Sequence, residues 1–279
     1  MSSKLPDENK FLDLSDYGRP AALYIARLLE KTKITPIHIT ISFIISGLLA
    51  VACIIYEFYW TAAFFLIIKS ILDAADGELA RLRNNPTYTG RYFDSVSDIF
   101  INFFLILAIW HITDSGLFYA LLAFIGIQLQ GTLYNYYYVI LRNRFDGDTT
   151  SRVFEVDAPV ARDGEKQKNV NVLFTLYKML YGIFDKTIFI LDRNAIKSNW
   201  FPKWFMTAVS ALGLGSQLLI IGVMLVLGWK QYIISFFIIY SLLIFLFVGI
   251  RKYYDSKFVA VSEKRIRINS QMFQIKEKS

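Results

Sequence analysis

The chain has 279 residues, of which 55% are hydrophobic and 16% aromatic, and its mean hydropathy is +0.41. This apolar share is above that of an ordinary soluble domain, and the charged residues are gathered between long apolar stretches, which argues against a soluble globular protein and favours a membrane protein. The single cysteine, Cys53, excludes an internal disulfide framework and a cysteine metal site.

The first thirty residues are polar and mixed in charge, so the sequence predicts no cleavable signal peptide. We therefore expect the amino terminus to stay in the cytoplasm. Within this region the short apolar stretch 23–29 is typical of an amphipathic helix that lies in the membrane interface. Residues 1–37 are predicted to form a cytoplasmic N-terminal segment that contains this interfacial helix.

A membrane-spanning helix needs about 17–25 mostly apolar residues. None of the six prolines falls within a stretch of this kind, which agrees with the use of proline at helix starts and in loops. We expect an all-α polytopic membrane protein with a six-helix transmembrane catalytic domain at 38–253 and a cytoplasmic tail at 254–279. The six predicted spans are about 38–57, 59–80, 93–113, 116–141, 204–228 and 231–250.

A further apolar stretch lies between the fourth and fifth predicted spans, in the loop 142–203. Residues 171–191 are long enough to cross a membrane, but Lys178, Asp185 and Lys186 interrupt them. A seventh span would also spoil the alternation of charge between the two sides of the membrane. We therefore expect an interfacial helix here, with a seventh span as the alternative.

The basic residues are distributed unevenly between the loops. Of the 30 Lys and Arg residues, all but Lys69 and Lys230 lie in segments that the six spans place on one side of the membrane. By the positive-inside rule, both termini and the Asp-rich segment between the second and third spans face the cytoplasm. A basic rim facing anionic lipid accounts for the net charge of +7, so no nucleic-acid partner is expected.

Four aspartates occur in residues 71–98, ILDAADGELARLRNNPTYTGRYFDSVSD. Residues three or four apart share a helix face, so Asp73 and Asp76 project together near the end of the second span, and Asp94 and Asp98 project together at the start of the third. A short connection makes these helices antiparallel neighbours, which lets the four carboxylates converge. Carboxylates in a membrane are costly and repel one another, and cations relieve both penalties.

The residue types around this segment indicate which ligands it binds. A carboxylate set with no neighbouring His or Cys prefers Mg²⁺ or Mn²⁺, and two pairs can hold two ions, an arrangement suited to displacement at phosphorus. Gly77, Ala80 and Gly90 leave the helix surfaces open to a nucleotide, and Arg81 can fork onto phosphate oxygens. Individually, the small residues could be helix-packing notches and Arg81 a headgroup anchor. Their joint spacing favours a binding site.

This spacing resembles the signature of the CDP-alcohol phosphotransferase (CDP-alcohol phosphatidyltransferase) family. Before the first span, where that family often has Thr-Pro-Asn, this chain has Thr35, Pro36 and Ile37. The match of residues is Asp73-x-x-Asp76-Gly77-x-x-Ala80-Arg81, then eight residues, then Gly90-x-x-x-Asp94-x-x-x-Asp98.

The resemblance implies an enzyme of phospholipid synthesis that transfers a substituted phosphoryl group from a CDP-linked donor to an alcohol and releases CMP. We expect CDP-diacylglycerol as the donor, and a CDP-choline or CDP-ethanolamine type of transferase acting on a lipid hydroxyl is the alternative. The resemblance also implies that the protein is a homodimer and that Asp98 acts as a general base. The implied metal ligands are Asp73, Asp76, Asp94 and Asp98, and the implied nucleotide contacts are Gly77, Ala80, Arg81 and Gly90.

Three further basic residues are candidates for substrate contacts. Lys69 can pair with Asp73 or contact phosphate, and Arg142 and Arg144 can receive a charged acceptor or simply cap the end of the fourth span. Two other functions would give different patterns of acidic residues. An intramembrane prenyltransferase would have two Asp-rich motifs, whereas this chain has one. A cation transporter would distribute its acids over several spans or within an inverted repeat.

Overall fold

The computed structural model describes residues 5–145, 155–198 and 200–257, and within these ranges the chain is helical and contains no strand. The expected all-α class is therefore confirmed. Short 3₁₀ helices occur at Asp7–Asn9, Leu14–Asp16, Arg193–Lys197 and Lys230–Tyr232. The α-helices are α1 (Arg19–Leu29), α2 (Pro36–Ile55), α3 (Tyr59–Leu82), α4 (Tyr88–His111), α5 (Leu117–Arg144), α6 (Gln167–Leu191), α7 (Lys203–Ser210), α8 (Leu214–Val226) and α9 (Ile233–Tyr240).

Several of these helices are long and apolar enough to cross a membrane. By length and composition, α2, α4, α5 and the helical run Lys230–Lys257 qualify, and the pair α7 and α8, bent by 47°, makes a fifth if it crosses as one. Their outer faces carry exposed apolar side chains such as Ile45 on α2, which is 53% exposed. The structure therefore supports a multi-pass membrane protein with four to five candidate spans.

The second predicted span, 59–80, corresponds to α3. This helix has 24 residues and packs along α2, but it carries Lys69, Asp73 and Asp76. Because of these charged residues, α3 is not among the candidate spans of the described chain. A total of six spans therefore requires that both this charged helix and the bent pair of α7 and α8 cross the membrane.

Two helices correspond to the segments expected in the interface. The first, α1, packs on α3, burying Ala22 and Ala26 and exposing Tyr24 and Leu28. The second, α6, packs against α4 and α5 and is not among the candidate spans of the described residues. Both have one buried and one exposed face, as an interfacial helix requires. Their placement in the interface stays a prediction.

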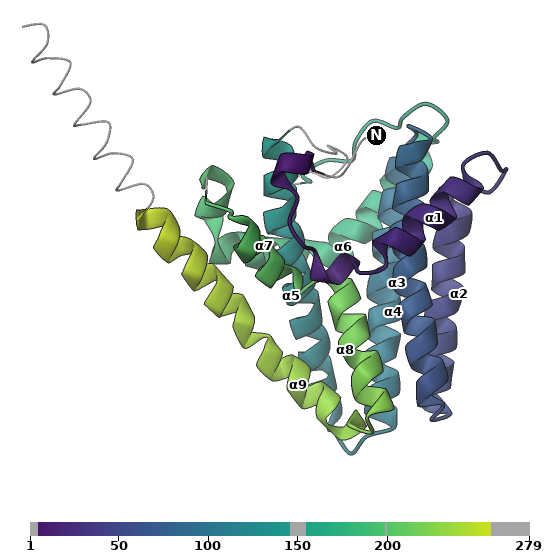
Figure 1. The fold of residues 1–279 in the computed structure, drawn as a ribbon, viewed down its shortest axis with the longest axis vertical. Coiled ribbons are helices and arrows are strands. Elements are labelled where there is room, and N and C mark those ends of the chain that lie inside the picture. The colour runs from purple at the N-terminus through teal and green to yellow at the C-terminus, as the bar shows by residue number, and fades with distance from the viewer. Residues whose placement is uncertain (1–4, 146–154, 199, 258–279) are drawn as a thin grey trace, which may run out of the picture.

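The bundle is built around α2, α3, α4 and α8, which run side by side in Figure 1, while α1 lies across their upper end. The helical run that starts with α9 packs on α5 and leans away from the other helices at its far end. The core is apolar and fully buried, and in a membrane such helices associate through close packing. Its side chains include Phe43, Leu66, Leu105, Leu218 and Phe237.

The segment before α1 is inserted into the bundle at this same end. The backbone N–H of Leu14 donates to Ser210 Oγ at 2.9 Å. The carbonyl of Ser15 lies so close to Gly215 that a Cβ at that position would be 1.8 Å from the carbonyl oxygen. Only glycine permits this approach, so Gly215 allows the N-terminal segment to lie over the start of α8, as Figure 1 shows.

A buried ion pair joins the end of α6 to the last helical run. The guanidinium of Arg251 donates to both oxygens of Asp192, and Tyr137 Oη donates to Asp192 Oδ2 at 2.7 Å. Asp192 is 0% and Arg251 1% exposed. We expect Asp192→Ala to lower the free energy of unfolding by about 3–5 kcal/mol, because it leaves a buried guanidinium with only the more distant Asp255, at 3.4 Å, as a charged partner.

Unfolding of the purified protein in mixed micelles, followed by circular dichroism, measures this loss. The exposed Asp163 offers a matched control, since Asp163→Ala removes a carboxylate from the surface. A surface ion pair contributes up to about 1 kcal/mol to the free energy of unfolding. A smaller loss for the Asp192 variant would show that burial gives this pair no additional effect.

Candidate active site

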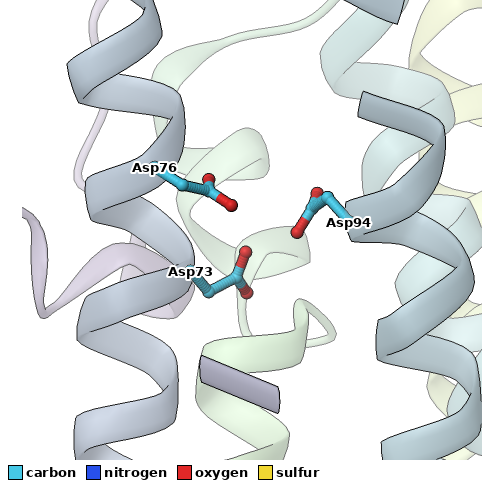
Figure 2. A group of neighbouring side chains, drawn as sticks. All are labelled: Asp73, Asp76 and Asp94. Atoms are coloured by element: carbon cyan, nitrogen blue, oxygen red, sulfur yellow. The ribbon is translucent and has the colours of Figure 1, made fainter. Parts of the chain in front are cut away.

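Three of the four predicted aspartates converge between α3 and α4. One carboxylate oxygen each from Asp73, Asp76 and Asp94 lies within 4.8 Å of the other two. Figure 2 shows the three side chains pointing from the two helices into a common space. The expected convergence is therefore present for these three residues.

Local signals in the sequence produce this arrangement. The backbone reverses direction after α3 through Asn84, which has a positive φ of 51°. The side chain of Thr87 then caps α4 by accepting a hydrogen bond from Gly90 N at 3.1 Å. The cap fixes the start of α4, so that Asp94 lies beside the pair of acids near the end of α3.

The three residues fit a divalent cation. Asp94 Oδ1 is buried and accepts no hydrogen bond from any residue that the structure describes. Asp76 is 8% exposed and accepts a hydrogen bond from Thr40 Oγ1 at 2.6 Å. A buried carboxylate oxygen without a partner is costly, and here it lies beside two further carboxylates. An all-oxygen set of this kind suits Mg²⁺ or Mn²⁺.

The fourth aspartate, Asp98, lies next to this cluster and is joined to it by a buried ammonium. Lys69 Nζ forms an ion pair with Asp98 and lies 3.5 Å from Asp73 Oδ2. Lys69 is 0% exposed, and its Nζ lies 4.9 Å from the centre of the Phe43 ring. Of the two roles weighed for Lys69, pairing with Asp73 is observed, and the ion pair with Asp98 is an addition.

A cavity of about 430 Å³ opens beside the acids. Most of the residues that the sequence singled out line it: Asp73, Asp76, Gly77, Ala80, Arg81, Gly90, Asp94, Asp98 and Arg142. Lys69 lies behind Asp73 and Asp98. Arg144 is not part of the lining, and its guanidinium lies 5.9 Å from the ring centre of Phe201.

A family model for CDP-alcohol phosphatidyltransferases matches residues 33–248, well over half of the chain. The chain belongs to this family. Comparison with curated proteins gave no match. The matched range contains the aspartate cluster and the helices around the cavity. Membership in the CDP-alcohol phosphatidyltransferase family supports phosphotransfer from a CDP-alcohol to an alcohol.

The side chain of Arg81 is held in place by its neighbours. A Cβ added to Gly77 would lie 3.4 Å from the terminal nitrogens of Arg81, so the guanidinium rests against a bare stretch of helix. Arg81 pairs with Glu78 at 2.8 Å, and Glu78 pairs with Arg19 at 2.5 Å. Arg81 is therefore oriented at the cavity wall by charged neighbours.

The segment before α1 completes this charged group. Arg19 also pairs with Asp16, which lines the cavity. Burial by itself would lower the pKa of Arg19, but the carboxylates of Asp16 and Glu78 raise it above its usual value. The Arg19 guanidinium therefore stays charged and ties α1 to α3.

Sequence reasoning missed a second set of lining residues, which come from segments far from the motif. No periodicity or motif relates them to the aspartates, because tertiary packing alone brings them to the cavity. The set comprises Asp13, Ser15 and Asp16 before α1, Tyr134 and Tyr138 on α5, and Tyr177, Tyr181 and Asp185 on α6.

Proposed function

We propose that this protein is an integral-membrane, metal-dependent phosphatidyltransferase of phospholipid synthesis. It transfers a substituted phosphoryl group from a CDP-linked donor, which we propose to be CDP-diacylglycerol, to an alcohol hydroxyl and releases CMP. The observation that carries the proposal is the convergence of Asp73, Asp76 and Asp94 at one cavity that Arg81 and Asp98 also line. A CDP-choline or CDP-ethanolamine type of donor, with a lipid hydroxyl as acceptor, is the second candidate.

The aspartate cluster is proposed to hold Mg²⁺ or Mn²⁺, with two ions as the expected number. When bound, such ions neutralise the diphosphate and stabilise charge that develops on phosphate oxygens. Asp73, Asp76 and Asp94 supply the ligand oxygens, with Asp98 as a further ligand. Arg81 donates hydrogen bonds to the phosphate oxygens from its fixed position.

Small residues around the cluster give the nucleotide close access to the backbone. Gly77 and Ala80 on α3 and Gly90 on α4 line the cavity and present no bulky side chain. We propose that the CDP part of the donor lies over this surface. Its diphosphate then reaches the aspartates and Arg81 together.

Asp98 is proposed to act as the general base. Its carboxylate takes the proton of the acceptor hydroxyl, and the hydroxyl oxygen forms a bond to the phosphorus farther from cytidine. The bond between that phosphorus and the bridging oxygen breaks, and CMP leaves with the bridging oxygen. Lys69 holds the carboxylate in position through its ion pair.

We also propose a membrane arrangement. In it α3 crosses together with α2, and the bent pair α7 and α8 forms one span, which gives six. Both termini and the cavity face the cytoplasm, because the basic residues gather in the segments at that side. The predicted tail, 254–279, lies outside the described residues from residue 258 onward. The homodimer that the resemblance implies remains a proposal.

The reaction is tested by incubating the purified protein, in lipid nanodiscs, with CDP-linked donors, alcohol acceptors and Mg²⁺ or Mn²⁺. We expect CMP to form only with a divalent cation, to stop on chelation and to resume when excess cation is returned. Asp94→Asn should abolish CMP formation, whereas Asp114→Asn, which changes an acid at the far end of α4, should not.

The rival functions give different results in the same preparation. A cation transporter would release no CMP from any donor but would pass metal ions across liposomes. A prenyltransferase would consume a prenyl diphosphate and leave CDP-linked donors unchanged. Either result would overturn the proposed function.

A further inference from the structure

One face of α6 forms a wall of the cavity that the motif does not explain. Tyr177, Tyr181 and Asp185 are spaced four residues apart, which aligns them along the helix, and all three line the cavity. The opposite face of α6 carries exposed Met179 and Ile183, at 74% and 68% exposure. The three lining residues are therefore the polar face of an amphipathic helix turned toward the reaction site.

These three side chains form a compact group. The rings of Tyr177 and Tyr181 are stacked, with centres 5.2 Å apart and planes 18° apart. Tyr177 Oη donates to Asp185 Oδ2 at 3.2 Å. The group thus presents one carboxylate beside the faces and edges of two tyrosine rings.

The charge of Asp185 is balanced only in part, by the charge of Arg91 nearby. The nearby cation, Arg91, forms an ion pair with Glu155, and within the described chain no Lys or Arg is paired with Asp185. The second oxygen of Asp185 also accepts no hydrogen bond from the described residues. A half-buried carboxylate that faces a cavity without an ion-pair partner of its own favours a positively charged ligand.

We infer that Asp185, Tyr177 and Tyr181 bind the ammonium group of an amino-alcohol moiety in one of the two substrates. This inference rests on the proposed function and names the substrate class at the same cavity. A carboxylate supplies a charge-assisted hydrogen bond to an ammonium, and tyrosine rings attract cations through their faces. The rings already lie near a cation, because the Arg91 guanidinium is 5.9 Å from the Tyr177 ring centre.

The position of the group relative to the reacting atoms supports this inference. Tyr181 Oη donates to the carbonyl of Ser95 at 3.0 Å, one residue after Asp94. Tyr181 is also close enough to Asp98 to interact with it electrostatically. One helical turn, about 5–6 Å, separates Tyr181 from Asp185. A small amino alcohol therefore has the size to place its oxygen toward Asp98 and its nitrogen at Asp185.

The ammonium group can come from two sources. It can belong to the acceptor, if CDP-diacylglycerol is the donor, or to the alcohol part of a CDP-linked donor, if a lipid hydroxyl accepts. An anionic acceptor is the contrary case, and Asp185 would repel it. Three lining arginines could bind such an anion, and each already has a neighbour. Arg81 pairs with Glu78 and Arg91 with Glu155, and Arg142 lies over the ring of Tyr138, 5.7 Å from its centre.

The ionisation of Asp185 gives a pH dependence. Burial raises the pKa of Asp185 to about 6, Glu155 adds to this rise, and the hydrogen bond from Tyr177 and the charge of Arg91 oppose it. Tyr181 is the remaining titratable group on this wall. The carboxylate is charged at neutral pH and loses its charge as the pH falls through about 6, so the affinity for an ammonium-bearing substrate should fall with it.

The test compares Asp185→Asn with the wild type in the nanodisc assay. The amide oxygen of Asn can still accept the hydrogen bond from Tyr177, so the substitution removes mainly the charge. We expect KM for the ammonium-bearing substrate to rise about tenfold or more, equivalent to about 1.4 kcal/mol, with kcat and the KM of the other substrate nearly unchanged. Asp185→Glu should restore most of the affinity.

Two comparisons exclude a merely structural effect. Asp157 is an exposed acid in the segment before α6, and Asp157→Asn should leave both KM values unchanged. With an uncharged alcohol in place of the amino alcohol, Asp185→Asn should have no effect on KM, and the fall in affinity below pH 6 should be absent.

Two substrate arms separate the sources of the ammonium. One pairs CDP-diacylglycerol with serine, ethanolamine and glycerol phosphate, and the other pairs CDP-choline and CDP-ethanolamine with diacylglycerol. Turnover of an amino alcohol in either arm, with the KM effect of Asp185→Asn, supports the inference. CMP release with glycerol phosphate or another anionic or uncharged alcohol alone overturns it but leaves the proposed function intact. No CMP release with any pair overturns both.

Discussion

Asp98→Asn is expected to lower kcat by about three orders of magnitude, while the affinity for the CDP-linked donor changes little. A positioned general base contributes on the order of 10²–10⁴ to a rate. The amide of Asn keeps the shape of the side chain and cannot take the acceptor's proton. Donor binding is retained because the three carboxylates that converge, Asp73, Asp76 and Asp94, remain in place.

Two measurements on the same preparation distinguish this role from metal binding. Single-turnover CMP formation reports the chemical step, and equilibrium binding of a labelled CDP donor in the presence of Mn²⁺ reports the ground state. Asp94→Asn is the matched comparison, since it should weaken both. If the Asp98 variant turns over at the wild-type rate, Asp98 is not the base; if it loses donor binding as Asp94→Asn does, its main role is as a metal ligand.

The part of the site that the sequence predicted is the part that local geometry controls. Asp73 and Asp76 are one helical turn apart, and a five-residue connection brings α4 back beside α3. Spacing within two consecutive helices was therefore enough to predict that the acids meet. It did not predict that Asp98 pairs with Lys69, because the rotamer of a long side chain depends on which neighbours are buried with it.

The arginines at the end of α5 show where spacing was not enough. Arg142 and Arg144 are two residues apart, which on a helix places them on nearly opposite faces. Arg142 lines the cavity and Arg144 lies near Phe201. The sequence alone does not show which face of the end of α5 is turned toward the cavity, so it predicts both arginines equally.

The remaining walls come from long-range packing. Asp13 accepts a hydrogen bond from Tyr134 Oη, more than a hundred residues away, and Asp185 reaches the cavity because α6 lies against α4 and α5. Neither contact can be predicted from residue spacing, because the residues that meet lie on different segments of the chain. The interruption of the apolar stretch 171–191 by charged residues was the available signal, and it indicated an interfacial helix without showing what its polar face contacts.

Lys69→Met is expected to lower activity by at least a hundredfold and to destabilise the metal-free protein. Lys69 is 0% exposed and pairs with Asp98 and Asp73. Methionine fills a similar volume without the charge, so the four carboxylates lose the cation that is buried among them. Removing one partner of a buried ion pair costs about 3–5 kcal/mol.

Divalent cations should compensate for part of this loss in stability. Because the aspartates repel one another more strongly without Lys69, added Mg²⁺ or Mn²⁺ should raise the unfolding temperature of Lys69→Met more than that of the wild type. Activity should not return with stability, since Asp98 then lacks the group that positions it. Exposed Lys186 on α6 provides the control, as Lys186→Met removes the same charge without touching the site.

The outcome decides how the acids of α3 are accommodated in a membrane protein. Equal stabilisation of the variant and the wild type by metal would mean that the carboxylates are balanced independently of Lys69. A larger stabilisation of the variant means that the lysine and the metal ions both balance the charge of the same carboxylates. In that case Lys69, the aspartates and a divalent ion form one electrostatic unit. The charge that distinguishes α3 from the purely apolar spans is then balanced only when the ion is bound beside the buried ammonium.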